Sequence, residues 1–153
     1  MRLLNNFFKS NKIECPRCLG KGNVDIEDIK RLKKELFWIP GKCAYCNGKG
    51  KVPPERIEKI SVDFDYLTTD LSFFERHRVI SGNKNAISKG NLQTELIKQV
   101  IEDIQQLYYN QNKNANEIAE LISRKYNIKL KSDIDKQDII DFIEHVIKNK
   151  TQN

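Results

Sequence analysis

The sequence predicts a mainly α protein in which a small cysteine-rich module with an inserted helix is followed by a helical bundle. Two observations predict the module: the only four cysteines of the 153-residue chain form two near-identical stretches, and a run with helical spacing lies between them. A third observation, three successive amphipathic patterns with short connections, predicts the bundle. Pro53-Pro54 marks the expected boundary, with residues 1–54 forming the module and residues 55–153 the helical domain.

The two cysteine stretches, residues 15–22 and 43–50, share the pattern C-x-x-C-x-G-x-G. A CxxC pair presents two thiolates from one tight turn, and two facing turns supply the four soft ligands that tetrahedral zinc prefers. Glycine permits the positive φ with which the chain reverses and turns its N–H groups toward the sulfurs. We therefore expect one structural Zn²⁺, with the ligands Cys15, Cys18, Cys43 and Cys46 and the turn glycines Gly20, Gly22, Gly48 and Gly50.

The pattern favours a structural metal site over a catalytic or redox-active one. Four cysteines fill a tetrahedral shell and leave no open position for water, which argues against catalytic zinc. A CxxC dithiol active site is the alternative, but such a motif normally begins a helix in a βαβ unit, whereas each motif here runs into Gly-x-Gly. The sequence has no glycine-rich phosphate loop and no nucleophile elbow, and it places no catalytic partner beside His77 or His145. We expect a protein that is not an enzyme.

The N-terminal half contains two expected helical segments. Residues 1–12 carry one apolar face, which either packs back on the body or forms an exposed docking segment; its members are Leu3, Leu4, Phe7 and Phe8. Between the motifs, Asp25 is the expected N-cap and Asp28 its capping-box partner. Apolar residues at helical spacing then predict a helix from Asp25 to Phe37, which Pro40-Gly41 ends before the second motif.

The C-terminal half begins with an alternation from Ile60 to Tyr66, which predicts a connecting strand. Thr69 or Asp70 caps a helix that reaches Ile80, and residues 81–85 resemble a turn. Residues 88–91 open the clearest helix, with an apolar stripe at Leu92, Leu96, Ile97, Val100, Ile101, Ile104, Leu107 and Tyr108.

Two further helices complete the expected bundle. Asn114 with Glu117 begins the first of them, and Ser132 with Asp135 precedes the last. Because the connections are short, the apolar stripes are expected to face one another as the bundle core.

The sequence contains no window near the ~18 consecutive apolar residues of a membrane span, so no membrane association is expected. Its first residues lack the apolar h-region and the cleavage site of a signal peptide. We expect a cytoplasmic protein, and in that compartment a reduced thiol pool favours metal binding over disulfides.

The net charge of +6 is unevenly distributed along the chain. Residues 1–60 hold 14 Lys and Arg against 7 Asp and Glu, whereas residues 61–153 hold 13 against 14. The basic half indicates either an acidic partner or cations that offset the −2 charge of a zinc with four thiolates.

The paired motifs resemble the cysteine-rich zinc-finger domain of DnaJ-type chaperones over residues 15–50. In that family the motif occurs four times and binds two zinc ions, so two copies imply a half-size domain with a single zinc. The family's domain handles unfolded or assembling proteins. The His-Pro-Asp tripeptide of a J-domain is absent, so stimulation of a DnaK-type ATPase is not implied; stand-alone assembly chaperones with this finger are the nearer analogy.

Two functions remain as hypotheses. The first is a non-enzymatic, zinc-stabilised protein-interaction module, a chaperone-like adaptor or assembly factor, with the candidate contacts Arg17, Leu19, Phe37, Trp38, Tyr45 and Asn47. Phe37 and Trp38 could instead form a small core beside the zinc. The second is nucleic-acid binding, in which Tyr45 or Trp38 stacks on a base and phosphates are bound by Arg17, Lys21, Lys30, Arg31, Lys33, Lys34, Lys42, Lys49 and Lys51. The sequence leaves the partner's identity and the oligomeric state open.

Overall fold

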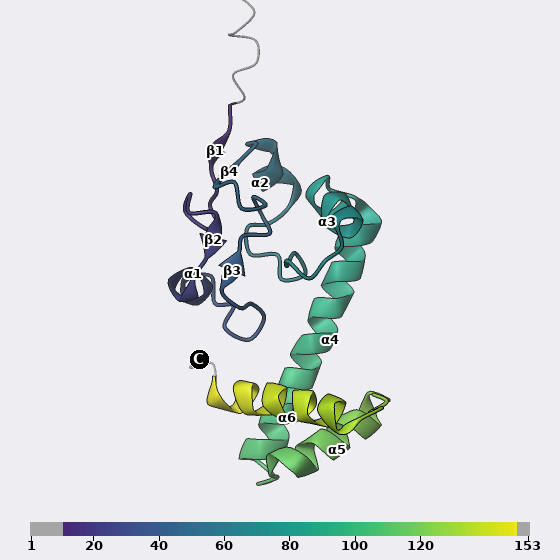
Figure 1. Ribbon diagram of the computed structural model, residues 1–153. Coiled ribbons are helices and arrows are strands. Elements are labelled where there is room, and N and C mark those ends of the chain that lie inside the picture. The colour runs from purple at the N-terminus through teal and green to yellow at the C-terminus, as the bar shows by residue number, and fades with distance from the viewer. Residues whose placement is uncertain (1–10, 150–153) are drawn as a thin grey trace, which may run out of the picture. The chain divides into compact units, whose positions relative to one another are not determined.

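The computed structural model describes residues 11–149 (Figure 1), and over this range the protein is mainly α, as predicted. The chain divides into two compact units, residues 1–92 and 93–153, which are described separately. The boundary expected after residue 54 falls inside the first unit. The apolar arm expected near the N-terminus has its four apolar residues outside the described range. None of the described helices combines the length and hydrophobicity that a membrane span requires.

Four two-residue strands frame the cysteine motifs in the first unit (Figure 1). β1 (Ile13–Glu14) and β2 (Asn23–Val24) flank the first motif, and β3 (Gly41–Lys42) and β4 (Lys51–Val52) flank the second. β1 pairs antiparallel with β4, and β2 pairs antiparallel with β3. Each ribbon thus joins the start of one motif to the end of the other, which brings the two motifs face to face.

The inserted helix, α1 (Ile26–Arg31), begins as predicted and ends earlier than predicted. Asp25 and Asp28 form the expected capping box. The helix stops because Lys33 adopts a left-handed conformation with φ of 57°, and the N–H of Lys34 then bonds to the Ile29 carbonyl at 2.9 Å. This is a Schellman ending with lysine where glycine is usual, so no residue type in the sequence indicates it.

The prediction of a strand from Ile60 to Tyr66 is wrong. α2 (Glu55–Lys59) comes just before this segment, which is itself an irregular loop. Ile60 is buried, and Val62 and Phe64 pack partly against the core of the first unit. The apolar alternation is therefore real, but the loop carbonyls bond to a side chain of the first cysteine motif and not to a neighbouring strand.

The last helices of the first unit are α3 (Phe73–Ile80), capped by Ser72, and the start of α4 (Lys84–Tyr109). α4 begins within the segment expected to be a turn, so Gly90 lies inside the helix and not at its start. Gly90 is buried, and a Cβ built on it would lie 2.7 Å from the Phe64 ring and 2.7 Å from the Tyr66 ring. The glycine makes room for these two aromatic rings.

The second unit contains the C-terminal part of α4 with α5 (Ala115–Lys125) and α6 (Asp133–Lys148). The predicted caps are confirmed: Asn114 and Glu117 form a capping box, and Ser132 accepts from the Asp135 N–H. In the predicted stripe of α4, Leu92 and Leu96 are exposed, whereas the helices of this unit bury the side chains of Ile101, Ile104, Ile118, Ala119, Ile122, Ile143 and Val146.

Candidate metal centre and its surroundings

The four cysteines meet in one buried cluster in the first unit. Their sulfur atoms all lie within 4.8 Å of one another, with 3.9 Å between Cys15 and Cys43 and 3.8 Å between Cys18 and Cys46. Zinc–sulfur bonds of about 2.3 Å in a tetrahedron place the sulfurs about 3.8 Å apart, whereas a disulfide requires about 2.05 Å. The cysteines are free, and the cluster could hold one metal ion.

The two motifs make the same backbone contacts around the cluster. The N–H of Gly22 donates to the sulfur of Cys18 at 3.2 Å, and the N–H of Gly50 donates to the sulfur of Cys46 at 3.2 Å. The Cys15 N–H bonds to the Gly50 carbonyl at 2.8 Å, and that of Cys43 bonds to the Gly22 carbonyl at 2.9 Å. The backbone therefore orients two of the four sulfurs and cross-links the motifs.

The motif glycines have the positive φ that the sequence predicts, from 76° to 82°. Two of them are also required because a side chain there would clash with the backbone of the other motif. A Cβ on Gly22 would lie 2.6 Å from the Gly48 carbonyl oxygen, and one on Gly50 would lie 2.4 Å from the Gly20 carbonyl oxygen. At these two positions, a side chain would be incompatible with the backbone conformation and would clash with the other motif.

Cys15 and Cys43 are joined by a hydrogen bond between their sulfur atoms. A hydrogen bond with Cys43 lowers the pKa of the Cys15 thiol to about 5, and the same bond raises the pKa of Cys43. Burial raises the pKa of Cys18. Metal ligation requires thiolates, so a bound metal ion would displace the protons of these thiols.

Arg17, a candidate partner contact, is only 2% exposed. Its guanidinium donates to three carbonyls of the loop after α2: Nε to Val62 at 2.8 Å, Nη1 to Leu67 at 2.7 Å and Nη2 to Phe64 at 3.2 Å. These bonds hold the loop against the first cysteine motif. They also explain why residues 60–66 do not form a strand.

The charge of Arg17 is balanced by the cysteine cluster. Burial lowers the pKa of Arg17 to about 10, and the negative charges of Cys43 and Cys15 oppose this effect. No carboxylate among residues 11–149 forms an ion pair with the guanidinium. A buried cation of this kind requires anions nearby, and the thiolates supply them.

The other candidate contacts lie in different surroundings. Tyr45 and Trp38 are buried, with the Tyr45 hydroxyl donating to the Ile60 carbonyl and the Trp38 indole donating to that of Asp65. Phe37 is half-buried. Leu19 and Asn47 are exposed, and each has a left-handed backbone conformation in the turn of its motif.

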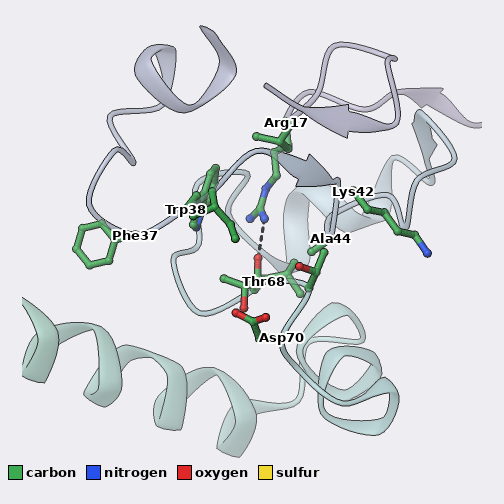
Figure 2. Close-up of a pocket in the computed structure, with 11 residues that line it drawn as sticks. Arg17, Phe37, Trp38, Lys42, Ala44, Thr68 and Asp70 are labelled. Atoms are coloured by element: carbon green, nitrogen blue, oxygen red, sulfur yellow. Dashed lines mark hydrogen bonds between the residues drawn. The ribbon is translucent and has the colours of Figure 1, made fainter. Parts of the chain in front are cut away.

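Three of the candidate contacts, Arg17, Phe37 and Trp38, line one hollow of about 50 Å³ (Figure 2). The sequence did not single out Ile39, which lines the same hollow and is 82% exposed. The remaining lining residues are apolar or small, apart from charges of opposite sign on Lys42 and Asp70. The hollow therefore combines apolar side chains with two cations, Arg17 and Lys42, and one anion, Asp70.

A second pocket, of about 270 Å³, adjoins the second cysteine motif. Its charged side chains are all cationic, and sequence reasoning singled out only two of them, Lys49 and Lys51. The others come from separate segments that the fold brings together, so no local pattern could have revealed them; the basic lining consists of Lys12, Lys49, Lys51, Arg56, Arg76 and His77. We call this site the basic pocket.

Several of the predicted phosphate contacts are already engaged. Lys21 pairs with Asp25 and Asp28, and Arg31 also pairs with Asp28. Lys34 pairs with Asp65, and Arg17 is buried. The exposed predicted cations that form no ion pair within residues 11–149 are Lys30, Lys33, Lys42, Lys49 and Lys51.

No family model, no curated protein and no solved structure matches this chain. Its function is therefore inferred from the contacts and charges of its own residues.

Proposed function

We propose that the protein is a non-enzymatic, zinc-stabilised protein-interaction module that serves as a chaperone-like adaptor or assembly factor. The observation that carries this proposal is the burial of all four cysteines, each 0–1% exposed, at the sulfur spacing of a tetrahedral thiolate site. A full and buried ligand shell has no position for water or substrate, so the metal would act on structure and not on chemistry.

The donor set supports zinc in particular. Four thiolates are soft ligands, and tetrahedral geometry with sulfur alone is typical of structural zinc. Four thiolates and one Zn²⁺ carry a net charge of −2, which would balance the buried guanidinium of Arg17 beside the cluster. When bound, zinc supplies on the order of 10–16 kcal/mol of apparent binding free energy, which in a small module is folding free energy. Strands of only two residues need such a contribution.

The hollow beside Trp38 is the proposed contact site for a protein partner (Figure 2). Ile39 exposes most of its side chain next to the buried indole of Trp38. Binding energy at protein interfaces concentrates where apolar anchors surround such a depression, and a polar rim sets the orientation. Lys42 and Asp70 provide that rim, so we expect the partner to present an apolar side chain flanked by charged groups.

A capture experiment with matched variants tests this function. The full-length zinc-loaded protein is immobilised, and proteins from native cells that bind at stoichiometric yield are identified and purified. Ile39→Asp should abolish the binding of the purified partner, whereas Ile57→Asp, at an exposed apolar residue on α2 outside the hollow, should leave it unchanged. Absence of any stoichiometric partner, or equal binding by both variants, would contradict the proposal.

A further inference from the structure

We propose that the basic pocket binds the phosphates of a single-stranded nucleic acid and that Phe73 stacks on one of its bases. The pocket lies beside β4, α2 and α3 and is distinct from the hollow at Trp38, with which it shares no lining residue. The inference concerns a second site and does not depend on the protein partner proposed above.

The lysines and arginines of the pocket have no carboxylate partner among the described residues, and Cys46 of the cysteine cluster also lines the pocket. None of the pocket's Lys and Arg side chains forms an ion pair within residues 11–149, and no Asp or Glu lines the pocket. Elsewhere in the first unit, cations such as Lys21 and Arg78 are paired with carboxylates. Clustered like charges repel one another, so an anionic ligand would be bound with a gain in electrostatic free energy.

Arg56 has a buried hydrogen-bond donor without a partner among the described residues. Its Nη1 donates to the Tyr45 carbonyl at 2.6 Å, while its Nε is buried and has no partner among the described residues. Burial lowers the pKa of Arg56, Tyr45 and the cysteines Cys15 and Cys46 oppose this effect, and the charge of Arg76 adds to it. Arg56 and Arg76 line the same pocket, and guanidinium groups offer donors suited to phosphate.

An exposed aromatic surface lies at the same site. Phe73 is 68% exposed, and its ring stacks on His77 with centroids 6.4 Å apart and 12° between the planes. The neighbouring ring of Phe74 is 78% exposed, but Phe74 does not line the pocket. A flat ring beside phosphate-binding cations is the usual arrangement for single-stranded nucleic acid, whose bases are free to stack.

The amount of charge favours a nucleic acid over a phosphorylated side chain. Three lysines and two arginines line the pocket. A phosphate monoester carries about −1.5 to −2 at neutral pH and would leave most of this charge unbalanced. Consecutive phosphodiesters match it better, and a duplex would withhold its base faces from Phe73.

Fluorescence anisotropy with a labelled short oligouridine tests the inference on the full-length, zinc-loaded protein. We expect binding that weakens with salt, with a slope of log Kobs against log[salt] near −2 to −3 if three or four phosphates are contacted. Lys49→Ala should make this slope shallower by about 0.7. Phe73→Ala should weaken binding about tenfold without changing the slope.

Matched controls separate the pocket from general basic character. Lys84→Ala removes an exposed lysine at the start of α4, and Phe74→Ala removes the adjacent ring; neither should change the affinity. Zinc content and thermal unfolding confirm that each variant is folded, and Lys51→Ala replaces Lys49→Ala if the latter is not. The inference is overturned if the oligonucleotide does not bind at low salt, if the control variants weaken binding equally, or if a duplex or a phosphopeptide binds more tightly than the single strand.

Discussion

The guanidinium carbon of Arg17 lies 4.2 Å from the centroid of the Trp38 ring. Arg17 belongs to the first cysteine motif and Trp38 to the segment between α1 and β3, and the same guanidinium donates to three carbonyls of the loop after α2. One buried side chain thus joins three segments that are distant in the sequence. The proposed zinc module and residues 55–92 are held together through this contact.

Arg17→Lys should destabilise the first unit by about 3 kcal/mol. A lysine cannot reach Val62, Phe64 and Leu67 together, and buried carbonyls without a donor are costly. Denaturant unfolding followed by the fluorescence of Trp38, the only tryptophan of the chain, measures the loss. Arg78→Lys, at an exposed arginine with only surface side-chain partners, is the control and should change little. Equal unfolding midpoints for the two variants would refute the role of Arg17.

Gly50→Ala should lower the zinc content and the stability of the first unit. The new Cβ would lie 2.4 Å from the Gly20 carbonyl oxygen at a φ of 77°, so both a clash and backbone strain arise, together costing more than about 2 kcal/mol. Gly41→Ala is the matched control because its Cβ would meet no atom within 4 Å. Metal analysis and thermal unfolding of the two variants should differ clearly; identical results would exclude the close approach of the motifs.

Gly90→Ala should destabilise the protein although it lies inside a helix. Replacing a helical glycine by alanine normally stabilises by about 1 kcal/mol. Here the added Cβ would lie 2.7 Å from the rings of Phe64 and Tyr66, and such overpacking costs about 1–3 kcal/mol. Ser88→Ala, at an exposed position of the same helix, should be neutral or slightly stabilising. A stabilising Gly90→Ala would show that the two rings do not pack there.

The second unit should lose stability in acid through Asp103. Hydrogen bonds from Lys125, and then from Tyr126, lower the pKa of this carboxyl. A depressed folded pKa contributes stability above the unfolded value of about 3.9, and the contribution disappears as pH falls through the folded value. The protection factors of the α5 amides against hydrogen exchange, corrected for the intrinsic pH dependence of exchange, should therefore fall below about pH 4. Asp103→Asn should already exchange faster at pH 7 and respond less to acid; an unchanged pH profile would contradict this.

Local chemistry accounts for the features that the sequence predicted. The clustering of the cysteines follows from two repeated motifs, and the positive φ of their glycines follows from the turn each motif makes. The helix starts at Asp25 and Asn114 follow from capping boxes, which involve only four consecutive residues. Each of these signals is contained within a short stretch of chain.

The features that the sequence did not predict depend on an unusual backbone conformation or on distant contacts. The end of α1 depends on Lys33 in a left-handed conformation, and the form of the loop after α2 depends on Arg17. Arg17 itself looked like a surface cation in the sequence, because nothing near it indicates that three carbonyls and an indole ring surround it. The basic pocket combines residues from several elements for the same reason.

The central proposal is that the four cysteines hold one structural zinc that orders residues 13–52. The most direct measurement is the metal content of protein purified under zinc-replete, reducing conditions, followed by chelation while Trp38 fluorescence and the amides of α5 and α6 are monitored. We predict one zinc per chain, and we predict that its removal exposes Trp38 while α5 and α6 stay helical. Protein without bound metal, or a Trp38 signal that is unchanged after complete chelation, would contradict the proposal.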